Sequence, residues 1–402
     1  MFTTVQQWVG RAAQPFSAAR HTPLTHERLR FNTLGLIALF KLFLFLGAAW
    51  DIQWHVVIGR DNLFIPPHIV AGLAYAGGLA LSLAALTYET WLDRQGKRLT
   101  GVIRLGGIVT SPAFLAVALS YLGGTVATGL DDQWHRLYGL DATLWSPPHL
   151  LIMVAMSGID FSLLLGFTAA ARRLGWGLDW RQPAFWGILL AAAYTFEAAN
   201  FQISQAFIEG FGRGGAGLWG LLFPIMMGAW YPLTLTAQVR ATGRFWVVLP
   251  VAFVCLVLQY LATGAAAAGF AILQPVSVMD EFVRANPTAV VSLAREFGRV
   301  NGFSDMIGLQ QAWIMWLSVI PLGLVALLDL RPALRRRPWL AAPVYSLSLV
   351  LVCYVVLQRL PHFWPAGGVT LAHLLLAMLL ATAGGLVTAW LGQKLGSVAD
   401  KM

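Results

Sequence analysis

Apolar stretches, each about as long as a membrane span, follow one another along the whole chain with short connections between them. A helix needs ~20 predominantly apolar residues to cross the hydrocarbon core of a bilayer. We expect ten spans, near residues 32–51, 68–90, 103–128, 149–171, 184–206, 216–238, 245–271, 308–328, 339–358 and 369–390. Ten spans in 402 residues leave no room for a large domain folded in water, which excludes nucleotide-binding and protease domains.

The composition supports this fold class, because 58% of the residues are hydrophobic and only 11% are charged. We therefore predict an all-α, polytopic helical membrane protein of about ten transmembrane helices, whose main partner is the lipid bilayer. The net charge of +9 comes from short basic clusters between apolar runs, as membrane topology requires, so nucleic acid is not an expected partner. Cys255 and Cys353 both lie in apolar runs, which excludes a disulfide framework and a thiolate metal cluster.

The distribution of Lys and Arg predicts the orientation in the membrane. The N-terminal segment and alternate connections carry nineteen of these residues, and the intervening connections carry seven. By the positive-inside rule, both termini are cytoplasmic in a multi-pass protein of the bacterial inner (plasma) membrane. We divide the chain into a basic cytoplasmic tail (1–31), a region of duplicated helix pairs (32–172), and six further spans (173–402) with a long outer connection at 272–307.

That outer connection should contain a short amphipathic helix. Asn286-Pro287 is typical of an N-cap followed by Pro at the first helical position. Val290, Leu293, Ala294 and Phe297 then recur at helical spacing, which predicts one apolar face.

A motif occurs twice in the first half of the chain, as DIQWHVVIGRDNLFIPPH at 51–68 and DDQWHRLYGLDATLWSPPH at 131–149. Apart from a one-residue gap, the Asp, Gln, Trp, His, Gly, Asp, Pro, Pro and His coincide. Each copy closes one span and opens the next. We therefore interpret helices 1 and 2 as an internal duplicate of helices 3 and 4.

The spacing within each copy predicts a cluster of metal-ligand side chains. Asp51 and His55 are four residues apart, which places a carboxylate and an imidazole on one helix face. The Pro66-Pro67 pair suits a helix start and brings His68 into the first turn of the next span. The equivalent residues of the second copy are Asp131, His135 and His149. Asp61 and Asp141 are expected to accept hydrogen bonds from ligand imidazoles and so fix their tautomers.

Six of the eight histidines fall on the predicted outer side, the remaining two of the six being His362 and His373. So many imidazoles with carboxylates at one depth predict metal or haem coordination, because polar groups in spans are costly unless they serve a site. The alternative is a purely hydrogen-bonded network. Imidazole with carboxylate and no thiolate suits copper, zinc, iron or nickel. We treat His362 and His373 as a separate pair, for a third metal site or a haem cofactor.

The pattern Asp-x3-His-x12-His, formed by Asp51, His55 and His68, resembles the copper-binding motif in one of the subunits of the membrane-bound copper methane and ammonia monooxygenases. The resemblance implies that these three residues bind copper, with the second copy as a related ligand set, and that the chemistry is oxygen-dependent hydroxylation. It covers about eighteen residues per copy. This chain departs from the family in having more spans, a duplicated motif and one extra residue before His149. The WH…SPPH stretch also resembles polytopic bacterial membrane proteins of no assigned function.

Three ionisable residues lie inside expected spans: Lys41, Asp160 and Glu197. A buried charge without a partner is costly, so we expect Lys41 to pair with one of the two acids. Glu197, Asn200 and Ser204 form a polar stripe at helical spacing, which is expected to line a cavity beneath the histidines.

Two functions account best for these features. The first is a metal-dependent oxidoreductase of redox or oxygenase type, with copper favoured, which would need a redox partner or additional membrane subunits. The second is a metal transporter or periplasmic metal-delivery protein that uses the same ligands. A lipid-linked glycosyl transferase or a non-catalytic membrane protein is the remaining alternative, although histidine outnumbers carboxylate at the site.

Overall fold

The structure is a computed structural model and describes residues 24–59, 64–138, 143–301, 315–359 and 368–399. The chain is almost entirely helical, and eight of the described helices are long and apolar enough to cross a membrane. It is therefore an all-α, multi-pass membrane protein, as the sequence predicts.

The helices match the expected spans closely. The two helix pairs of the first half are α2 (Leu24–Val57), α3 (Pro66–Arg94), α4 (Pro112–Tyr138) and α5 (Pro147–Arg173). The long helices that follow are α6 (Pro183–Gly212), α7 (Leu222–Thr242), α8 (Val248–Leu273), α13 (Ala341–Leu357) and α14 (Leu371–Val398). The shorter helices are α9 (Met279–Ala285), α10 (Val290–Asn301) and α12 (Val319–Ala326). Short 3-10 helices are Trp219–Leu221, Leu327–Leu330, Pro332–Arg336 and Pro338–Leu340.

Two expected spans are not among the eight. One corresponds to α6, which has thirty residues but carries a polar stripe. The other corresponds to the shorter apolar helix Met315–Leu330, and residues 308–314 of that expected span lie outside the described residues.

The expected span 103–128 begins too early. Residues 103–110 form a two-stranded antiparallel hairpin, β1 (Ile103–Leu105) and β2 (Ile108–Thr110), and α4 starts at Pro112. Gly106 and Gly107 make the turn with positive φ angles of 54° and 81°, a geometry that favours glycine in tight hairpins. Hydropathy alone does not separate these apolar strand residues from the helix that follows them.

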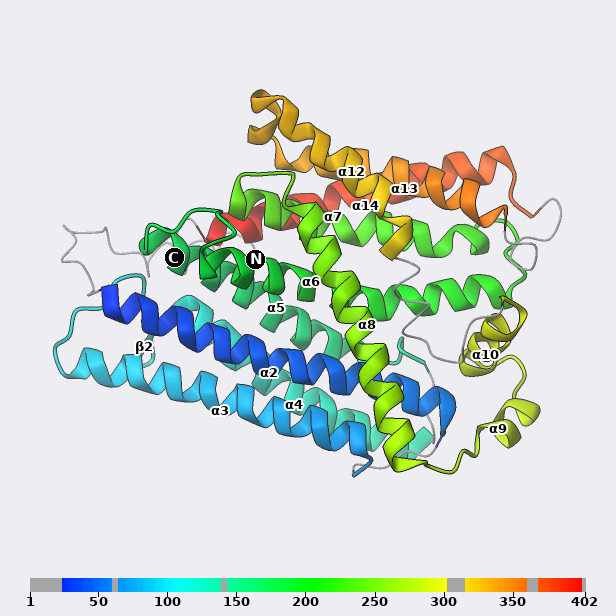
Figure 1. Cartoon of the computed structure of the whole chain (residues 1–402), viewed down its shortest axis with the longest axis horizontal. Coiled ribbons are helices and arrows are strands. Elements are labelled where there is room, and N and C mark those ends of the chain that lie inside the picture. The colour runs from blue at the N-terminus through cyan, green and yellow to red at the C-terminus, as the bar shows by residue number, and fades with distance from the viewer. Residues whose placement is uncertain (1–23, 60–63, 139–142, 302–314, 360–367, 400–402) are drawn as a thin grey trace.

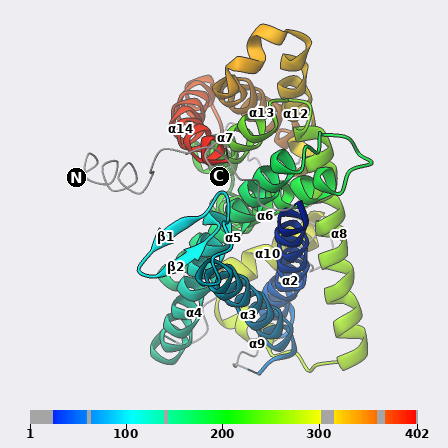
Figure 2. The same cartoon turned by 90° about the vertical axis from the view of Figure 1, so that its left-hand side faces the viewer.

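Helix α6 lies at the centre of the bundle and is buried on nearly all sides. It packs against α5, α7, α8 and α10. The pairs α2/α3 and α4/α5 lie on one side of it, and α7, α12, α13 and α14 lie on the other, while α8 crosses steeply between the two groups (Figures 1 and 2). A helix with polar residues buried all round depends on its neighbours to satisfy them.

The elements near the duplicated motif gather at one end of the bundle. The α2/α3 and α4/α5 junctions, α9, α10 and the beginning of α14 lie there, whereas the beginning of α2, the hairpin and the end of α14 lie at the other end (Figure 1). We call these the motif end and the hairpin end.

Helix α10 confirms the predicted amphipathic helix, although it starts at Val290. Its apolar face packs onto the bundle, because the Phe297 ring lies 4.9 Å from that of Phe207 and 5.1 Å from that of Phe211, measured between centroids. The sequence did not predict α9. The backbone N–H of Val278 just before it donates to the carbonyl oxygen of Ile58, which attaches this connection to the end of α2.

Helix α2 starts at Leu24, so part of the expected tail is helical, and residues 1–23 lie outside the described residues.

The hairpin end is held together by buried charged side chains. Arg30 of α2 donates to Glu89 of α3, to Glu27 at 2.7 Å and to the Thr100 carbonyl at 2.9 Å. Glu89 also accepts the backbone N–H of Ser111. This network fixes α2, α3 and the hairpin relative to one another.

Candidate metal centre

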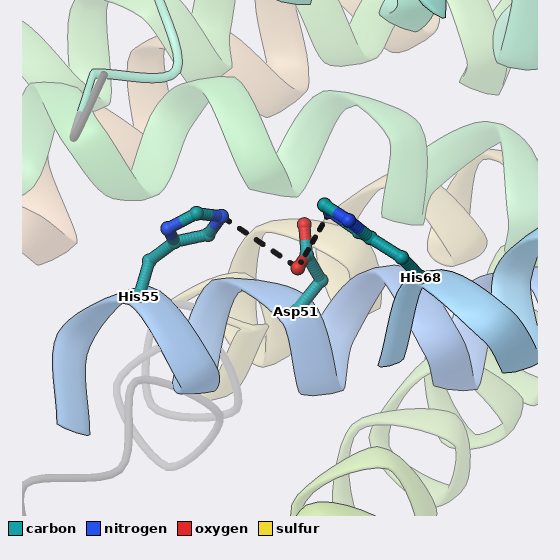
Figure 3. A group of neighbouring side chains, drawn as sticks. All are labelled: Asp51, His55 and His68. Atoms are coloured by element: carbon teal, nitrogen blue, oxygen red, sulfur yellow. Dashed lines mark ion pairs between the residues drawn. The ribbon is translucent and has the colours of Figure 1, made fainter. Parts of the chain in front are cut away.

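The first copy of the motif forms a compact triad across the α2/α3 junction. Asp51 and His55 lie in the last two turns of α2, and His68 lies in the first turn of α3. Both imidazoles turn their Nε2 atoms toward the same carboxylate oxygen (Figure 3). Asp51 Oδ1 is 3.1 Å from His68 Nε2 and 3.6 Å from His55 Nε2.

The second copy forms the same arrangement across the α4/α5 junction. His135 Nε2 is 3.5 Å from Asp131 Oδ2, and His149 Nε2 is 3.4 Å from Asp131 Oδ1. In each triad one ligand atom per residue can be chosen so that all three lie within 4.8 Å of one another. The structure therefore brings together all six residues that the spacing predicted.

The distances within the triads suit a shared metal better than direct hydrogen bonds. Two ligands at about 2.1 Å from a tetrahedral metal lie ~3.4 Å from each other. The four carboxylate-to-imidazole distances lie between 3.1 and 3.6 Å. Only the shortest, from Asp51 to His68, is a normal hydrogen-bond length.

The orientation of His149 also favours a cation between the ligands of the second triad. Its Nδ1 lies 2.6 Å from the carbonyl oxygen of Thr143, and a carbonyl can only accept, so Nδ1 carries the proton. In the neutral ring, Nε2 then presents a lone pair toward Asp131. Two lone pairs at 3.4 Å repel each other unless a cation lies between them. A bound metal, or a second proton on the ring, supplies that cation.

Two buried atoms of the triads lack a hydrogen-bond partner. Asp51 Oδ1 has His68 Nε2 at 3.1 Å, but Asp131 Oδ1 is buried and accepts no hydrogen bond of normal geometry from the described residues. The same is true of His55 Nδ1. Buried polar atoms are rarely left without partners, and carboxylate oxygens ready to accept are what a metal ligand set provides. The residues present therefore fit a metal ion.

The two triads adjoin each other. The rings of His55 and His135 stack with their centroids 6.4 Å apart and an angle of 1° between their planes. His149 of the second triad is also an electrostatic neighbour of the Asp51 carboxylate. Six candidate ligands from four helices thus form one centre at the motif end.

Helix α6 fixes the segment that precedes His149. The side chain of Gln205 accepts the backbone N–H of Leu144 and donates to Thr143 Oγ1 at 2.6 Å. Trp145 Nε1 donates to the backbone carbonyl of Gln202 at 3.2 Å. The sequence predicted that the polar stripe on α6 lies beneath the histidines, but it did not predict the contact of Gln205 with Thr143, because this contact joins residues about sixty positions apart in the chain.

The remaining predicted site residues are not brought into the triads. Asp61, Asp141 and His362 lie outside the described residues. His373 lies in the first turn of α14, where its Nδ1 accepts the backbone N–H of Thr370 in a reciprocal capping arrangement. This role accounts for one ring nitrogen of His373, and the assignment of His362 and His373 to a haem stays a prediction.

The buried charges lie deeper in the bundle. Lys41 Nζ is 3.0 Å from Asp160 Oδ1, and both side chains are almost completely buried, so Asp160 is the acid that pairs with Lys41. Glu197 contacts uncharged side-chain amides instead. The polar stripe on α6 packs against α7 and α8, for example where Tyr231 donates to Asn200.

Comparison with known proteins adds no family to these observations: no family model, no curated protein and no solved structure matches the chain. The functional assignment therefore depends on the geometry of the site.

Proposed function

We propose that the chain binds a transition metal, with copper favoured, at the two adjoining Asp/His triads, and that it is an oxidoreductase of redox or oxygenase type. The observation that carries the proposal is the pair of equivalent triads, in which imidazole Nε2 atoms face a carboxylate at spacings that suit a common metal. In this proposal Asp51, His55 and His68 hold one ion. Asp131, His135 and His149 hold a second ion or complete the same site.

The donor set supports copper over the common alternatives. Imidazole nitrogen is a good ligand for copper, zinc and iron, whereas calcium and magnesium prefer six or more oxygens. Copper binds most tightly among the divalent first-row metals at a given nitrogen and oxygen site. The resemblance of Asp51, His55 and His68 to the copper motif of the monooxygenases points to the same metal.

A bound copper ion would supply one-electron redox chemistry with dioxygen. The protein's own contributions are to orient the imidazoles, through contacts such as that of His149 with Thr143, and to keep two ligand sets adjacent. The electrons would come from a redox partner or a further membrane subunit. The positive-inside distribution supports placing the centre at the outer face of the inner membrane, with both termini cytoplasmic.

The position of the ligands makes transport the weaker candidate. Transporter sites usually lie near the middle of the bilayer between broken helices. Here the ligands lie within two turns of helix ends, since α2 ends at Val57 and α3 begins at Pro66.

Metal analysis of the purified protein tests the proposal. After growth with sufficient copper, iron and zinc, we expect the wild type to contain one or two copper ions per chain. His55→Ala and His149→Ala should each lose most of the metal. His373→Ala is the matched control, because it removes a histidine at the same end of the bundle that does not belong to the triads. A wild type without stoichiometric transition metal would refute the proposal.

A second measurement separates the redox function from metal delivery. The copper-loaded wild type should consume oxygen when a reductant is supplied, and His68→Ala should not. Stoichiometric copper without reductant-dependent oxygen consumption would refute the oxidoreductase and favour the delivery protein.

A further inference from the structure

Glu197 lies in the centre of the bundle, and no cationic side chain of the described residues pairs with it. Its side chain is 1% exposed, and it lies on α6, which is itself enclosed by other helices. Lys41 already forms its ion pair with Asp160. Among the described residues, no lysine, arginine or histidine forms an ion pair with Glu197.

The contacts of Glu197 suit a neutral acid. Its Oε2 accepts from the side-chain amides of Gln259 and, at 3.4 Å, of Asn200. Its Oε1 is buried and has no hydrogen-bond partner among the described residues, and the same is true of Gln259 Oε1. A proton on Oε1 would neutralise the carboxylate without displacing the hydrogen bonds that Oε2 accepts. The titratable groups that face it are Asp160, Cys255 and Tyr231, none of which brings a positive charge.

The cost of burying an unpaired charge favours the protonated form of Glu197. An ionised carboxylate in a low-dielectric interior costs several kcal/mol unless a cation or several strong donors compensate it. Two amide donors, one of them at 3.4 Å, and the weakly donating thiol of Cys255 are weak compensation. Within spans, such ionisable residues typically serve proton or ion pathways.

Polar side chains on α6 lie between Glu197 and the motif end. Asn200 and Ser204 follow it at intervals of three and four residues, on the same side of the helix, and both are buried. Gln205 then contacts Thr143, whose carbonyl accepts from His149. From Glu197 to Gln205 the helix rises ~12 Å.

We propose that Glu197 is an intramembrane proton-binding site that is neutral at rest and exchanges its proton with the outer face along the polar side of α6. The proposal goes beyond metal binding and does not depend on it, because Glu197 lies outside the triads. The bound species is a proton, and the path leads from the bundle centre to the end where the metal centre lies.

Infrared spectroscopy of the purified protein tests it. A protonated carboxyl group has a C=O stretching band that an ionised one lacks, and the band shifts when the proton is replaced by deuterium. We expect such a band in the wild type, a shift of the band in D2O, and loss of the band in Glu197→Gln. Glu209→Gln is the matched control, with the same change near the end of the same helix. If Glu197→Gln does not fold, Glu197→Asp should move the band.

A variant that leaves Glu197 in place tests the proposed proton path along α6. Ser204→Ala removes a hydroxyl that, among the described residues, donates to the carbonyl of Phe201, and we expect slower deuterium exchange of the Glu197 band. Ser162→Ala removes a similar buried hydroxyl from α5 and should leave the exchange rate unchanged.

Three results would overturn the proposal. The first is a wild type without a protonated-carboxyl band. If sodium also raised the melting temperature of the wild type and not that of Glu197→Gln, the site would bind a metal cation instead of a proton. The second is a band that does not shift in D2O. The third is equal exchange rates in Ser204→Ala and the wild type. Measurements on chelator-treated protein keep these outcomes separate from any failure of metal binding.

Discussion

His55 of α2 and His135 of α4 stack with parallel rings whose centroids are 6.4 Å apart, although they belong to different triads. The two rings are close enough for each to form part of the surroundings of the other. We therefore expect a substitution in one triad to alter metal binding at the other.

We predict that the two triads bind metal in a coupled manner. The losses in copper-binding free energy caused by His55→Ala and His135→Ala should fail to add by about 0.5–3 kcal/mol, as for residues in direct contact. Competition titrations with a chelator on the two single variants and the double variant measure this coupling. His55→Ala combined with His373→Ala is the control and should be additive. Additive losses for the His55 and His135 pair would mean that the triads are independent sites.

Much of this fold could be predicted from the sequence, because a span is defined by the length and polarity of one local stretch. The triads were also predictable, since a spacing of four residues on a helix and a proline-started next helix are local features. The hairpin at 103–110 was missed because its apolar residues look like the start of a span. Two glycines at its turn were the available signal.

The features that could not be predicted depend on contacts between distant segments. The sequence left both Asp160 and Glu197 as partners for Lys41, and only the packing of α2 against α5 selects Asp160. The stacking of His55 on His135 and the contact of Gln205 with Thr143 likewise require the relative positions of separate helices. No local pattern encodes these positions.

Gln205 should act as a positioning residue for His149. Gln205→Leu removes both side-chain contacts with residues 143–144, so the carbonyl that orients His149 is no longer fixed. We expect copper affinity to fall by about 10–100-fold, as is typical when the support of a ligand imidazole is lost. Chelator competition measures the affinity, and circular dichroism verifies the fold.

Gln202→Leu is the matched control for that prediction. The hydrogen bond from Trp145 goes to the backbone carbonyl of Gln202, so a change of the Gln202 side chain leaves this bond in place. The control should keep its affinity. If both variants lose copper equally, the effect comes from general damage to α6 and not from the position of His149.

The ion pair of Lys41 and Asp160 should be costly to break from one side. Lys41→Met leaves a buried carboxylate alone, and we expect destabilisation of about 3–5 kcal/mol, seen as a lower melting temperature in detergent. Lys41→Met with Asp160→Asn should recover much of this loss, because no uncompensated charge remains. Lys41→Met with Glu197→Gln is the control and should show no recovery. Recovery by Glu197→Gln instead of Asp160→Asn would show that the pairing is wrong.

The orientation can be tested with single cysteines, because the native Cys255 and Cys353 are fully buried and should give little background labelling. Arg336 and Thr288 are both exposed; Arg336 lies in the basic connection between α12 and α13, and Thr288 lies between α9 and α10. A membrane-impermeant thiol reagent applied to intact cells should label Thr288→Cys and should label Arg336→Cys only after permeabilisation. This outcome follows from the excess of basic residues at the hairpin end, which the positive-inside rule places in the cytoplasm. Labelling of position 336 from outside would invert the topology and would place the metal centre at the cytoplasmic face.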